Sequence, residues 1–211
     1  MSGRFIVFEG GEGAGKSTQA RLLADALRQR GLDVVMTREP GGTVGAEAIR
    51  ALLLDPQGPG WGARAEALLF AAARADHVER LIRPALAEGK WVICDRYLDS
   101  SRAYQGGGGG LSDSDVMDLH RIGSEGLLPD LTLLLTVDGE EAARRLRARD
   151  GDESDAIGGR PAAYHARVGE AFHAFAAAEP QRFAVIEATG TPEEIHLRIL
   201  TALDQLSEQA A

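Results

Sequence analysis

The chain has 211 residues, of which 44% are hydrophobic and 26% are charged, and its formal net charge is -9. This excess of acid argues against a protein that binds nucleic acid non-specifically, because such a protein needs a basic face for the phosphates. No apolar run approaches the roughly 20 residues of a membrane span. Cys94 is the only cysteine, which excludes an intrachain disulfide. With no signal-peptide pattern at the start, a cytoplasmic location is expected.

Short apolar runs alternate with helical patterns, an order typical of parallel strands joined by crossover helices. Apolar residues recur at helical spacing from Ala65 to Leu86 and from Ile195 to Leu206. The later helix opens with Thr191-Pro192-Glu193-Glu194, which offers a capping residue, a proline at the first helical position and a glutamate at the third. Strands are expected at Phe5–Phe8, Val34–Thr37, Trp91–Cys94, Leu131–Val137 and Phe183–Ile186.

Two segments do not fit this alternation. Gly106–Gly110 is a run of five glycines, and so permissive a backbone has no preferred shape of its own. Asp150–Gly159 is polar and acidic, and we expect a mobile loop there. The rest of the pattern predicts one α/β domain over residues 1–211, with a parallel sheet of about five strands flanked by helices.

The segment Gly10–Ser17 matches G-x-x-x-x-G-K-[ST], and an expected strand precedes it, as this phosphate-binding motif requires. Glycines let backbone N–H groups approach a polyphosphate, and the start of the following helix adds partial positive charge. Lys16 and Lys90 are the only lysines, so a chain that otherwise uses arginine keeps a compact ammonium here. A glycine-rich turn without ligand is the alternative. The expected ATP contacts are Gly10, Gly11, Glu12, Gly13, Ala14, Gly15, Lys16, Ser17 and Thr18.

A carboxylate, Asp95, directly follows the expected strand Trp91–Cys94. In proteins with this phosphate loop, such a carboxylate lies beside the loop and helps to hold magnesium, which the hydroxyl of Ser17 also ligates. Many strands end in aspartate by chance, so the prediction depends on the loop. Together the two residues predict an Mg²⁺ site.

Six groups of residues along the chain carry a resemblance to a known family. In chain order they are Phe8-Glu9-Gly10, Thr37-Arg38-Glu39-Pro40-Gly41-Gly42-Thr43, Leu69-Phe70-Ala71-Ala72-Ala73-Arg74, Asp95-Arg96-Tyr97 with Ser100-Ser101, Ala103-Tyr104-Gln105-Gly106, and Pro129-Asp130-Leu131-Thr132. Together they resemble bacterial thymidylate kinase. The phosphate loop is shared by very many proteins, whereas Arg38–Thr43 and Asp95–Gly106 are far more specific. The resemblance implies the P-loop nucleoside-monophosphate-kinase fold, ATP and Mg²⁺, thymidine monophosphate (dTMP) as acceptor in dTTP synthesis, and a homodimer.

The resemblance also implies roles for single residues. Arg38 and Arg96 would hold the acceptor phosphate, and a cis bond between Glu39 and Pro40 would shape its pocket. Phe70 would stack on the thymine, and Arg74, one helical turn later, would hydrogen-bond O4. Without the resemblance, Phe70 reads as a core residue and each arginine as half of a surface ion pair. The remaining implied contacts are Ser101 and Gln105 at the base edge, and Glu12 and Tyr104 at the 3′-hydroxyl, where the Tyr104 ring disfavours a ribose.

Kinases of this type close a lid over ATP, which excludes water, and the resemblance places it around residues 147–160. The loop interior Glu12-Gly13-Ala14 has no arginine, so the lid would supply the one that stabilises the transition state. Two features depart from the family: Ala156 follows Asp155 where an Asp-Arg pair is common, and Gly109 stands where arginine is frequent. The lid candidates are Arg149 and Arg160, then Arg147, whereas Arg144 and Arg145 fit a solvated helix face at least as well. Adenine is expected between the lid arginines and the loop Ala188–Thr191.

Three other functions remain open. The chain could phosphorylate another nucleoside monophosphate, or a deoxynucleoside with Glu9 or Asp95 as the base, although two arginines favour an anionic acceptor. A regulatory GTP-binding protein would need a guanine-selecting Asn-Lys-x-Asp segment, which the sequence lacks. An inactive relative is the third alternative, and only the altered lid suggests it.

Overall fold

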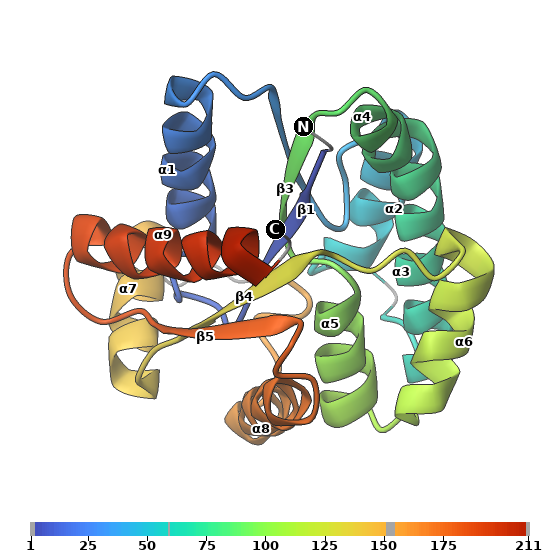
Figure 1. Ribbon diagram of the computed structural model, residues 1–211. Coiled ribbons are helices and arrows are strands. Elements are labelled where there is room, and N and C mark those ends of the chain that lie inside the picture. The colour runs from blue at the N-terminus through green and yellow to red at the C-terminus, as the bar shows by residue number, and fades with distance from the viewer. Residues whose placement is uncertain (1–2, 59, 151–154, 210–211) are drawn as a thin grey trace.

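A parallel sheet of five strands in the order β2-β3-β1-β4-β5 forms the centre of the protein (Figure 1). The computed structural model describes residues 3–58, 60–150 and 155–209. The predicted α/β fold is confirmed, and every expected strand is present within one residue of its expected bounds. The strands are β1 (Phe5–Glu9), β2 (Val34–Arg38), β3 (Trp91–Asp95), β4 (Leu131–Thr136) and β5 (Phe183–Glu187).

Helices join the strands, as parallel pairing requires. At the start of the last helix, Thr191 N donates to Glu194 Oε2 at 2.9 Å and Glu194 N donates to Thr191 Oγ1 at 3.3 Å, which confirms the expected cap. No helix within the described ranges is long and apolar enough to cross a membrane. The α-helices are α1 (Lys16–Gln29), α2 (Val44–Leu54), α3 (Ala63–His77), α4 (Arg83–Ala87), α5 (Leu98–Ser101), α6 (Asp113–Ser124), α7 (Gly139–Asp150), α8 (Ala162–Ala178) and α9 (Pro192–Gln209), and η1 (Val78–Ile82) and η2 (Arg102–Gly108) are π-helical.

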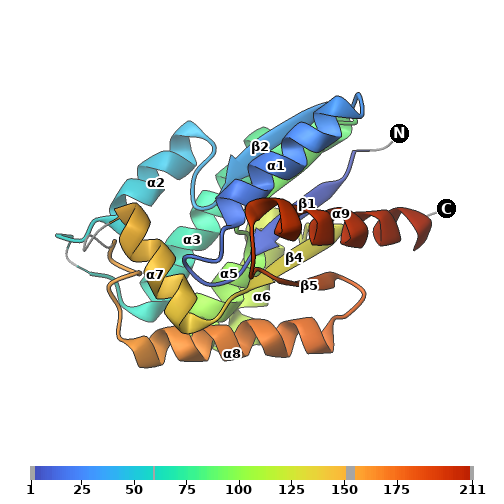
Figure 2. The ribbon, with the colours of Figure 1, turned by 90° about the vertical axis from the view of Figure 1, so that its left-hand side faces the viewer.

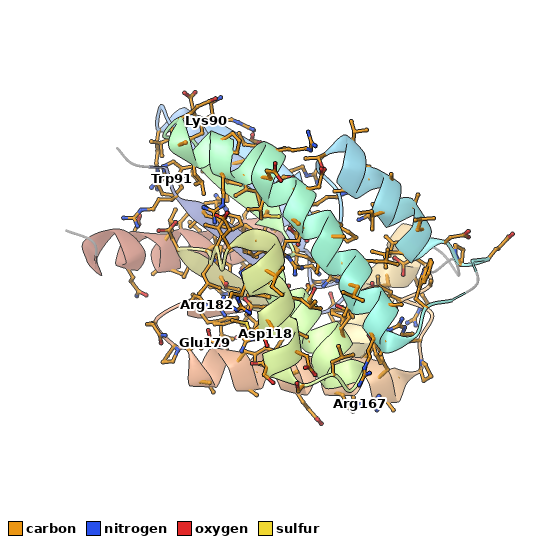
Figure 3. The ribbon with its side chains drawn as sticks, turned by 90° about the vertical axis from the view of Figure 1, so that its right-hand side faces the viewer. Lys90, Trp91, Asp118, Arg167, Glu179 and Arg182 are labelled. Carbon is orange, nitrogen blue, oxygen red and sulfur yellow. The ribbon has the colours of Figure 1, made fainter. Side chains whose placement is uncertain are left out.

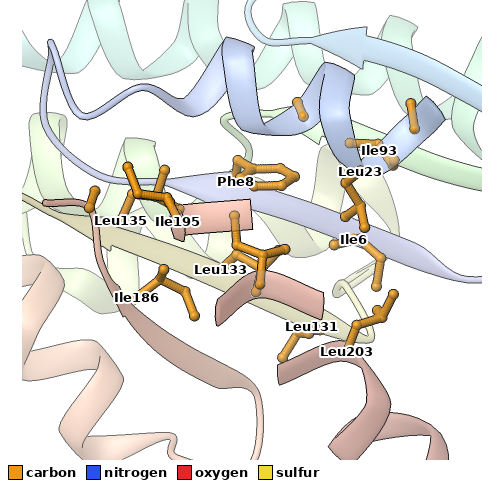
Figure 4. Close-up of a cluster of buried hydrophobic side chains, with 14 of the residues drawn as sticks. Ile6, Phe8, Leu23, Ile93, Leu131, Leu133, Leu135, Ile186, Ile195 and Leu203 are labelled. Carbon is orange, nitrogen blue, oxygen red and sulfur yellow. The ribbon is translucent and has the colours of Figure 1, made fainter. Parts of the chain in front are cut away.

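The sheet is buried on both faces because side chains of β1 alternate between two apolar clusters. Ile6 and Phe8 point to one face, where α1 and α9 cover them with Leu23, Ile195 and other residues (Figure 4). Phe5 and Val7 point to the opposite face, which η1, α4 and α6 cover. Figure 2 shows α1 and α9 lying on the same side of the strands. Burial of the sheet therefore fixes the positions of the strand ends and of the loops that follow them.

The glycine run, which the sequence gives no preferred shape of its own, has a defined shape in the fold. Gly106–Gly108 continue η2, and α8 packs against them. A Cβ atom on Gly107 would lie 2.6 Å from Ala171 Cβ, and one on Gly108 would lie 2.5 Å from the Tyr164 ring. The neighbouring helix, rather than local propensity, therefore orders this segment, and it does so because glycines permit the close approach.

Candidate active site

The carboxyl ends of three neighbouring strands bring the motif residues to one edge of the sheet. β1 and β2 both flank β3, and their register sets Phe8 and Arg38 opposite Asp95. The phosphate loop leaves β1 at this edge, and Arg96 follows β3 at the same height. In open α/β sheets ligands bind in the crevice at this end of the strands. Parallel pairing thus brings motifs that are far apart in the sequence together at one edge of the sheet.

The phosphate loop has the backbone conformation that its glycines allow. Gly10, Gly13 and Gly15 have φ of 133°, 73° and 91°, values at which side chains are strained. A Cβ on Gly10 would lie 2.3 Å from Leu135 O, and one on Gly13 would lie 2.5 Å from Ala142 O. Glycine is therefore required at Gly10 and Gly13 for two reasons. The φ angle strains other residues, and the backbone at Leu135 and Ala142 leaves no room for a Cβ atom.

Lys16 is folded back over the loop. Its Nζ donates to Gly11 O at 2.7 Å and to Gly10 O at 3.1 Å. Burial lowers the pKa of Lys16 to about 7, and the Arg96 guanidinium acts in the same direction. A polyphosphate would supply negative charge that favours the ammonium form. The site is therefore suited to an anionic ligand.

Two oxygen groups that could hold a divalent cation meet beside the loop. Ser17 Oγ donates to Asp95 Oδ2 at 2.5 Å, and both residues line the same cleft. Among the described residues no cluster of three or more His, Cys, Asp or Glu side chains could hold a metal. Mg²⁺ normally takes one or two carboxylates together with phosphate oxygens and waters, so this pair fits it.

Arg96 occupies a left-handed backbone conformation, with φ of 70°, which is uncommon outside glycine. Its Nη1 donates to Gly10 O at 3.2 Å and to Ser100 Oγ at 3.1 Å, and its guanidinium lies 5.0 Å from the centre of the Tyr104 ring. Backbone strain that persists at such a position commonly marks a functional site. The strained turn places this guanidinium directly beside the phosphate loop.

The buried carboxylate of Glu9 holds the turn that carries Arg96. It accepts hydrogen bonds from Tyr97 N and Ser100 N, both at 2.9 Å, and from Ser100 Oγ at 2.6 Å. Burial raises the pKa of Glu9 to about 7, and the Asp99 carboxylate contributes in the same direction. Glu9 therefore acts on the site through the backbone of the turn, and it does not line the cleft.

Two further guanidiniums line the cleft from the side of β2 and α2. Arg38 forms a bidentate pair with Glu47, at 2.9 and 3.0 Å, and remains 54% exposed. Arg50 donates to Pro40 O at 2.8 Å, and burial followed by repulsion from Arg38 lowers its pKa. An anion in the cleft would relieve that repulsion, because Arg38, Arg50 and Arg96 all line it. The sequence analysis missed Arg50, which nothing in its helix distinguishes from a surface arginine.

The other end of the cleft is built around Arg74. Arg74 Nε donates to Glu39 Oε2 at 2.7 Å, and its Nη2 donates to Tyr97 O at 3.0 Å and to Ser101 Oγ at 2.9 Å. His77 also contacts Glu39, 3.0 Å from Oε1, and the Glu39-Pro40 bond is cis, as expected. The guanidinium is thus fixed by three partners before any ligand arrives.

A buried ion network anchors the segment that carries Ser101, Tyr104 and Gln105. Arg182 makes two bonds to the Asp99 carboxylate, at 2.6 and 2.8 Å, and also bonds Glu179. Arg102 joins the same two carboxylates, at 3.0 and 2.7 Å. Figure 3 shows Glu179 and Arg182 close together. The network ties α5 and η2 to the start of β5.

These parts enclose one cleft of about 550 Å³. It collects most of the residues that the sequence singled out, but Gly10, Gly11, Ala14 and Arg160 are not among those that line it. Its lining residues include Glu12, Gly13, Gly15, Lys16, Ser17, Thr18, Arg38, Phe70, Arg74, Asp95, Arg96, Ser101, Tyr104 and Gln105. The cleft thus joins a phosphate loop and the guanidiniums of Arg38, Arg50 and Arg96 to a pocket that Phe70 flanks.

Comparison with known proteins agrees with this geometry. The family model described as thymidylate kinase matches residues 8–199. The chain is 58% identical to a thymidylate kinase of Rhizorhabdus wittichii over 206 residues, covering 98% of this chain and 99% of that one. It is 49% identical to one of a Bradyrhizobium species over 194 residues, covering 92% and 86%. The chain belongs to the thymidylate kinase family.

A solved structure supports the same conclusion for the fold. The crystal structure of thymidylate kinase from Ehrlichia chaffeensis matches with a TM-score of 0.79 and 33% identity, covering 96% of this chain and 100% of that one. The five-stranded parallel sheet with flanking helices is therefore that of the thymidylate kinase family, a P-loop nucleoside-monophosphate-kinase fold.

The arginines expected in the lid lie in different places. The side chain of Arg149 is outside the described residues. Arg160 bonds Glu66 and donates to Tyr164 OH at 2.7 Å, and it is not among the residues that line the cleft. Arg147 is exposed. Arg145, which the sequence assigned equally well to a solvated face, lines the cleft and donates to Ala188 O at 3.0 Å. Helical spacing alone could not reveal which arginine of α7 faces the cleft.

Proposed function

We propose that the chain transfers the γ-phosphoryl group of ATP to dTMP, giving ADP and dTDP, as one step toward dTTP. The observation that carries the proposal is the cleft itself, where Arg38, Arg50 and Arg96 face the phosphate loop and Phe70 flanks the adjoining pocket. Several cationic groups at one place suit two anionic phosphates, and an aromatic face suits a base. The family to which the chain belongs has this activity.

The proposed reaction needs positioning more than proton transfer. The second pKa of a phosphate monoester is about 6, so at neutral pH the acceptor is already largely an anionic nucleophile. Catalysis then consists of bringing two repelling anions into line and neutralising the charge between them. Lys16 would bind the β- and γ-phosphates, while Arg38 and Arg96 would hold the acceptor. No side chain has to act as a general base.

Mg²⁺ is part of the proposal, with Ser17 and Asp95 as the residues that would hold it or its waters. When bound, the ion would supply positive charge that neutralises the phosphates. The 2.5 Å contact between Ser17 Oγ and Asp95 Oδ2 supports this assignment, because both are hard oxygen donors.

The acceptor nucleoside would lie at the end of the cleft that is built around Arg74. Phe70 would stack on the thymine and Arg74 would donate to O4, with Ser101 and Gln105 at the base edge. Glu12 and Tyr104 would approach the 3′-hydroxyl, where the buried Tyr104 ring leaves little room for a ribose. The Tyr104 hydroxyl is buried without a hydrogen-bond partner among the described residues, which suits contact with a ligand.

A spectroscopic assay of ADP release with a panel of acceptors tests the proposal. We expect Mg-dependent turnover with dTMP, weaker turnover with dUMP, and little with CMP or thymidine. Activity on thymidine alone would indicate a deoxynucleoside kinase, and preference for CMP would indicate another monophosphate kinase. ATP binding with no turnover on any acceptor would indicate an inactive relative. Each of these results would overturn the assignment to dTMP.

The lid, which we place around residues 147–160 of a single 1–211 domain, would supply the arginine that stabilises the transition state. Arg160 would have to leave Glu66 to reach the phosphates, so Arg149 ranks first. We expect Arg149→Ala to lower kcat about a hundredfold with little change in KM. Arg145→Ala should instead raise KM for ATP, since Arg145 adjoins the loop Ala188–Thr191 where adenine would bind. Unchanged kcat in both Arg149→Ala and Arg160→Ala would remove both lid candidates.

We also propose a homodimer and a cytoplasmic location. Helices α3 and α6 lie side by side (Figure 3) and expose Leu68 and Ile122, which are 56% and 71% exposed. Exposed apolar side chains on adjoining helices suit an interface with a second copy. Light scattering should give twice 22.4 kDa, and a monomer mass at micromolar concentration would contradict the dimer. The single buried cysteine, Cys94, is compatible with a reducing compartment, which cell fractionation would test.

A further inference from the structure

Gln105 has one satisfied and one unsatisfied end. Its Nε2 donates to Glu66 Oε1 at 2.9 Å, while its Oε1 is buried and has no hydrogen-bond partner among the described residues. Gln105 is 1% exposed and lines the cleft, whereas Glu66, 4% exposed, lies behind it. A buried acceptor without a partner is costly unless a ligand supplies a donor.

The carboxylate of Glu66 determines which end of the Gln105 amide is free. An ionised carboxylate only accepts hydrogen bonds, so the NH₂ group of Gln105 must face it. Arg160 Nη2 donates to the other oxygen, Glu66 Oε2, which keeps the carboxylate in place. Arg160 is held in turn by Tyr164, whose hydroxyl donates to Tyr104 O at 2.8 Å. The orientation of one amide is thus fixed by a chain of donors and acceptors.

Glu66 also lies on the same face of α3 as two residues that would contact the base. Glu66, Phe70 and Arg74 follow one another at intervals of four on α3, and therefore share one face of the helix. Among described partners, the hydrogen bonds of Arg74 use Nε and Nη2, which leaves Nη1 as a donor. This face thus offers a donor in Arg74 beside an acceptor in Gln105.

We infer that Glu66 is a positioning residue that makes Gln105 an acceptor for a ring N–H, and so selects 4-oxo pyrimidines over cytosine. The inference rests on the proposed function. Thymine and uracil present a carbonyl O4 and an N3–H, which match Arg74 and Gln105. Cytosine presents an amino group and an unprotonated N3. A donor would then face the donor of Arg74, and an acceptor would face the acceptor of Gln105. A site whose buried polar groups are left unpaired rejects a ligand strongly.

Glu66→Gln tests the inference because it should reverse the amide of Gln105. Arg160 is a donor and would retain the oxygen of the introduced side chain, so the NH₂ group of that side chain would face Gln105. The Gln105 oxygen would then turn toward the introduced NH₂ group, and the Gln105 NH₂ group would turn toward the cleft. We expect the ratio of kcat/KM for dTMP to that for dCMP to fall about 10- to 100-fold, with a rise in the dCMP value.

Two further variants show whether Glu66 acts through Gln105. Gln105→Met should also reduce the ratio, and adding Glu66→Gln to it should change the ratio no further. Glu66→Asp keeps an acceptor-only group and should retain most of the discrimination. Glu170→Gln, an exposed change on α8, is the matched control and should leave both kcat/KM values unaltered.

The outcomes separate the inference from the proposed function. A wild-type protein with no turnover on dTMP would contradict the proposed function. An active wild type whose ratio is unchanged in Glu66→Gln would overturn the inference alone, as would an equal loss on both substrates. If Glu66→Gln does not fold, Glu66→Ala carries the test, because it also frees the Gln105 amide to rotate and should lower the ratio.

Discussion

Lys16→Met should lower kcat with ATP and dTMP by about a thousandfold or more. The substitution keeps the length of the side chain and removes the ammonium that lies over the phosphate loop, 2.7 Å from Gly11 O. Preorganised charge in a water-poor site commonly contributes two to three powers of ten for a single donor, so about three are expected here. The wild-type Lys16 is buried and has its pKa lowered to about 7, so Met also removes a desolvated cation. The variant should fold. Its free energy of unfolding should exceed that of the wild type most at low pH, where the buried Lys16 of the wild type is charged.

The sequence provides a matched control, because Lys90 is the only other lysine. Lys90 precedes β3 at the opposite end of the strand from Asp95 and pairs with Glu88 at 2.6 Å (Figure 3). Lys90→Met should leave kcat and both KM values within about twofold, since exposed ion pairs contribute little. Steady-state kinetics of the two variants measure the contrast. Retention of a tenth of the wild-type kcat in Lys16→Met would contradict the role given to this residue.

Arg96→Gly and Arg96→Ala should lose activity equally but differ in stability. Either change removes the guanidinium that would hold the acceptor phosphate, so kcat/KM for dTMP should fall about a hundred- to a thousandfold. The backbone of Arg96 has φ of 70°, which glycine adopts freely and alanine does not. The glycine variant should therefore be the more stable of the two, by about 1 kcal/mol.

Urea denaturation and steady-state kinetics on the same samples separate the two effects. Arg28→Ala, on the exposed side of α1, is the control and should preserve kcat/KM. If Arg96→Ala kept its activity while Arg96→Gly lost it, backbone geometry and not the guanidinium would be responsible. Equal stability of the two variants would show that the left-handed turn carries no strain.

The strands could be predicted from the sequence because apolar runs of four or five residues suffice for a buried parallel sheet. Their ends could not, since Glu9, Arg38 and Asp95 are charged and read as loop residues. Each belongs to its strand because the ladder continues: Arg38 is paired with Asp95, and Glu39 N still donates to Asp95 O at 3.0 Å. For the glycines of η2, tertiary packing against α8 replaced the missing local preference.

The part of the site that could be predicted lies in short contiguous motifs. The phosphate loop, Asp95 and Arg96 follow strands directly, so their place in the fold follows from sheet topology. Arg50 and Arg145 lie within helices. Whether such a side chain lines the cleft or faces solvent depends only on which way its helix face is turned. The role that we propose for Glu66 could not be predicted for another reason. Glu66 would act on the base only through the side-chain amide of Gln105.

The contact between α8 and η2 determines which part of the molecule can pivot. Tyr164 lies against Gly108 and bonds Tyr104 O, Arg160 bonds Glu66, and Ile157 is buried in the same cluster as Tyr104, so the chain is held against the base pocket from Ile157 onward. A hinge for the proposed lid must therefore precede Ile157. Enclosure of ATP by such a lid would be mechanically separate from choice of the base, so that the acceptor would be selected while the nucleotide triphosphate is still free to leave.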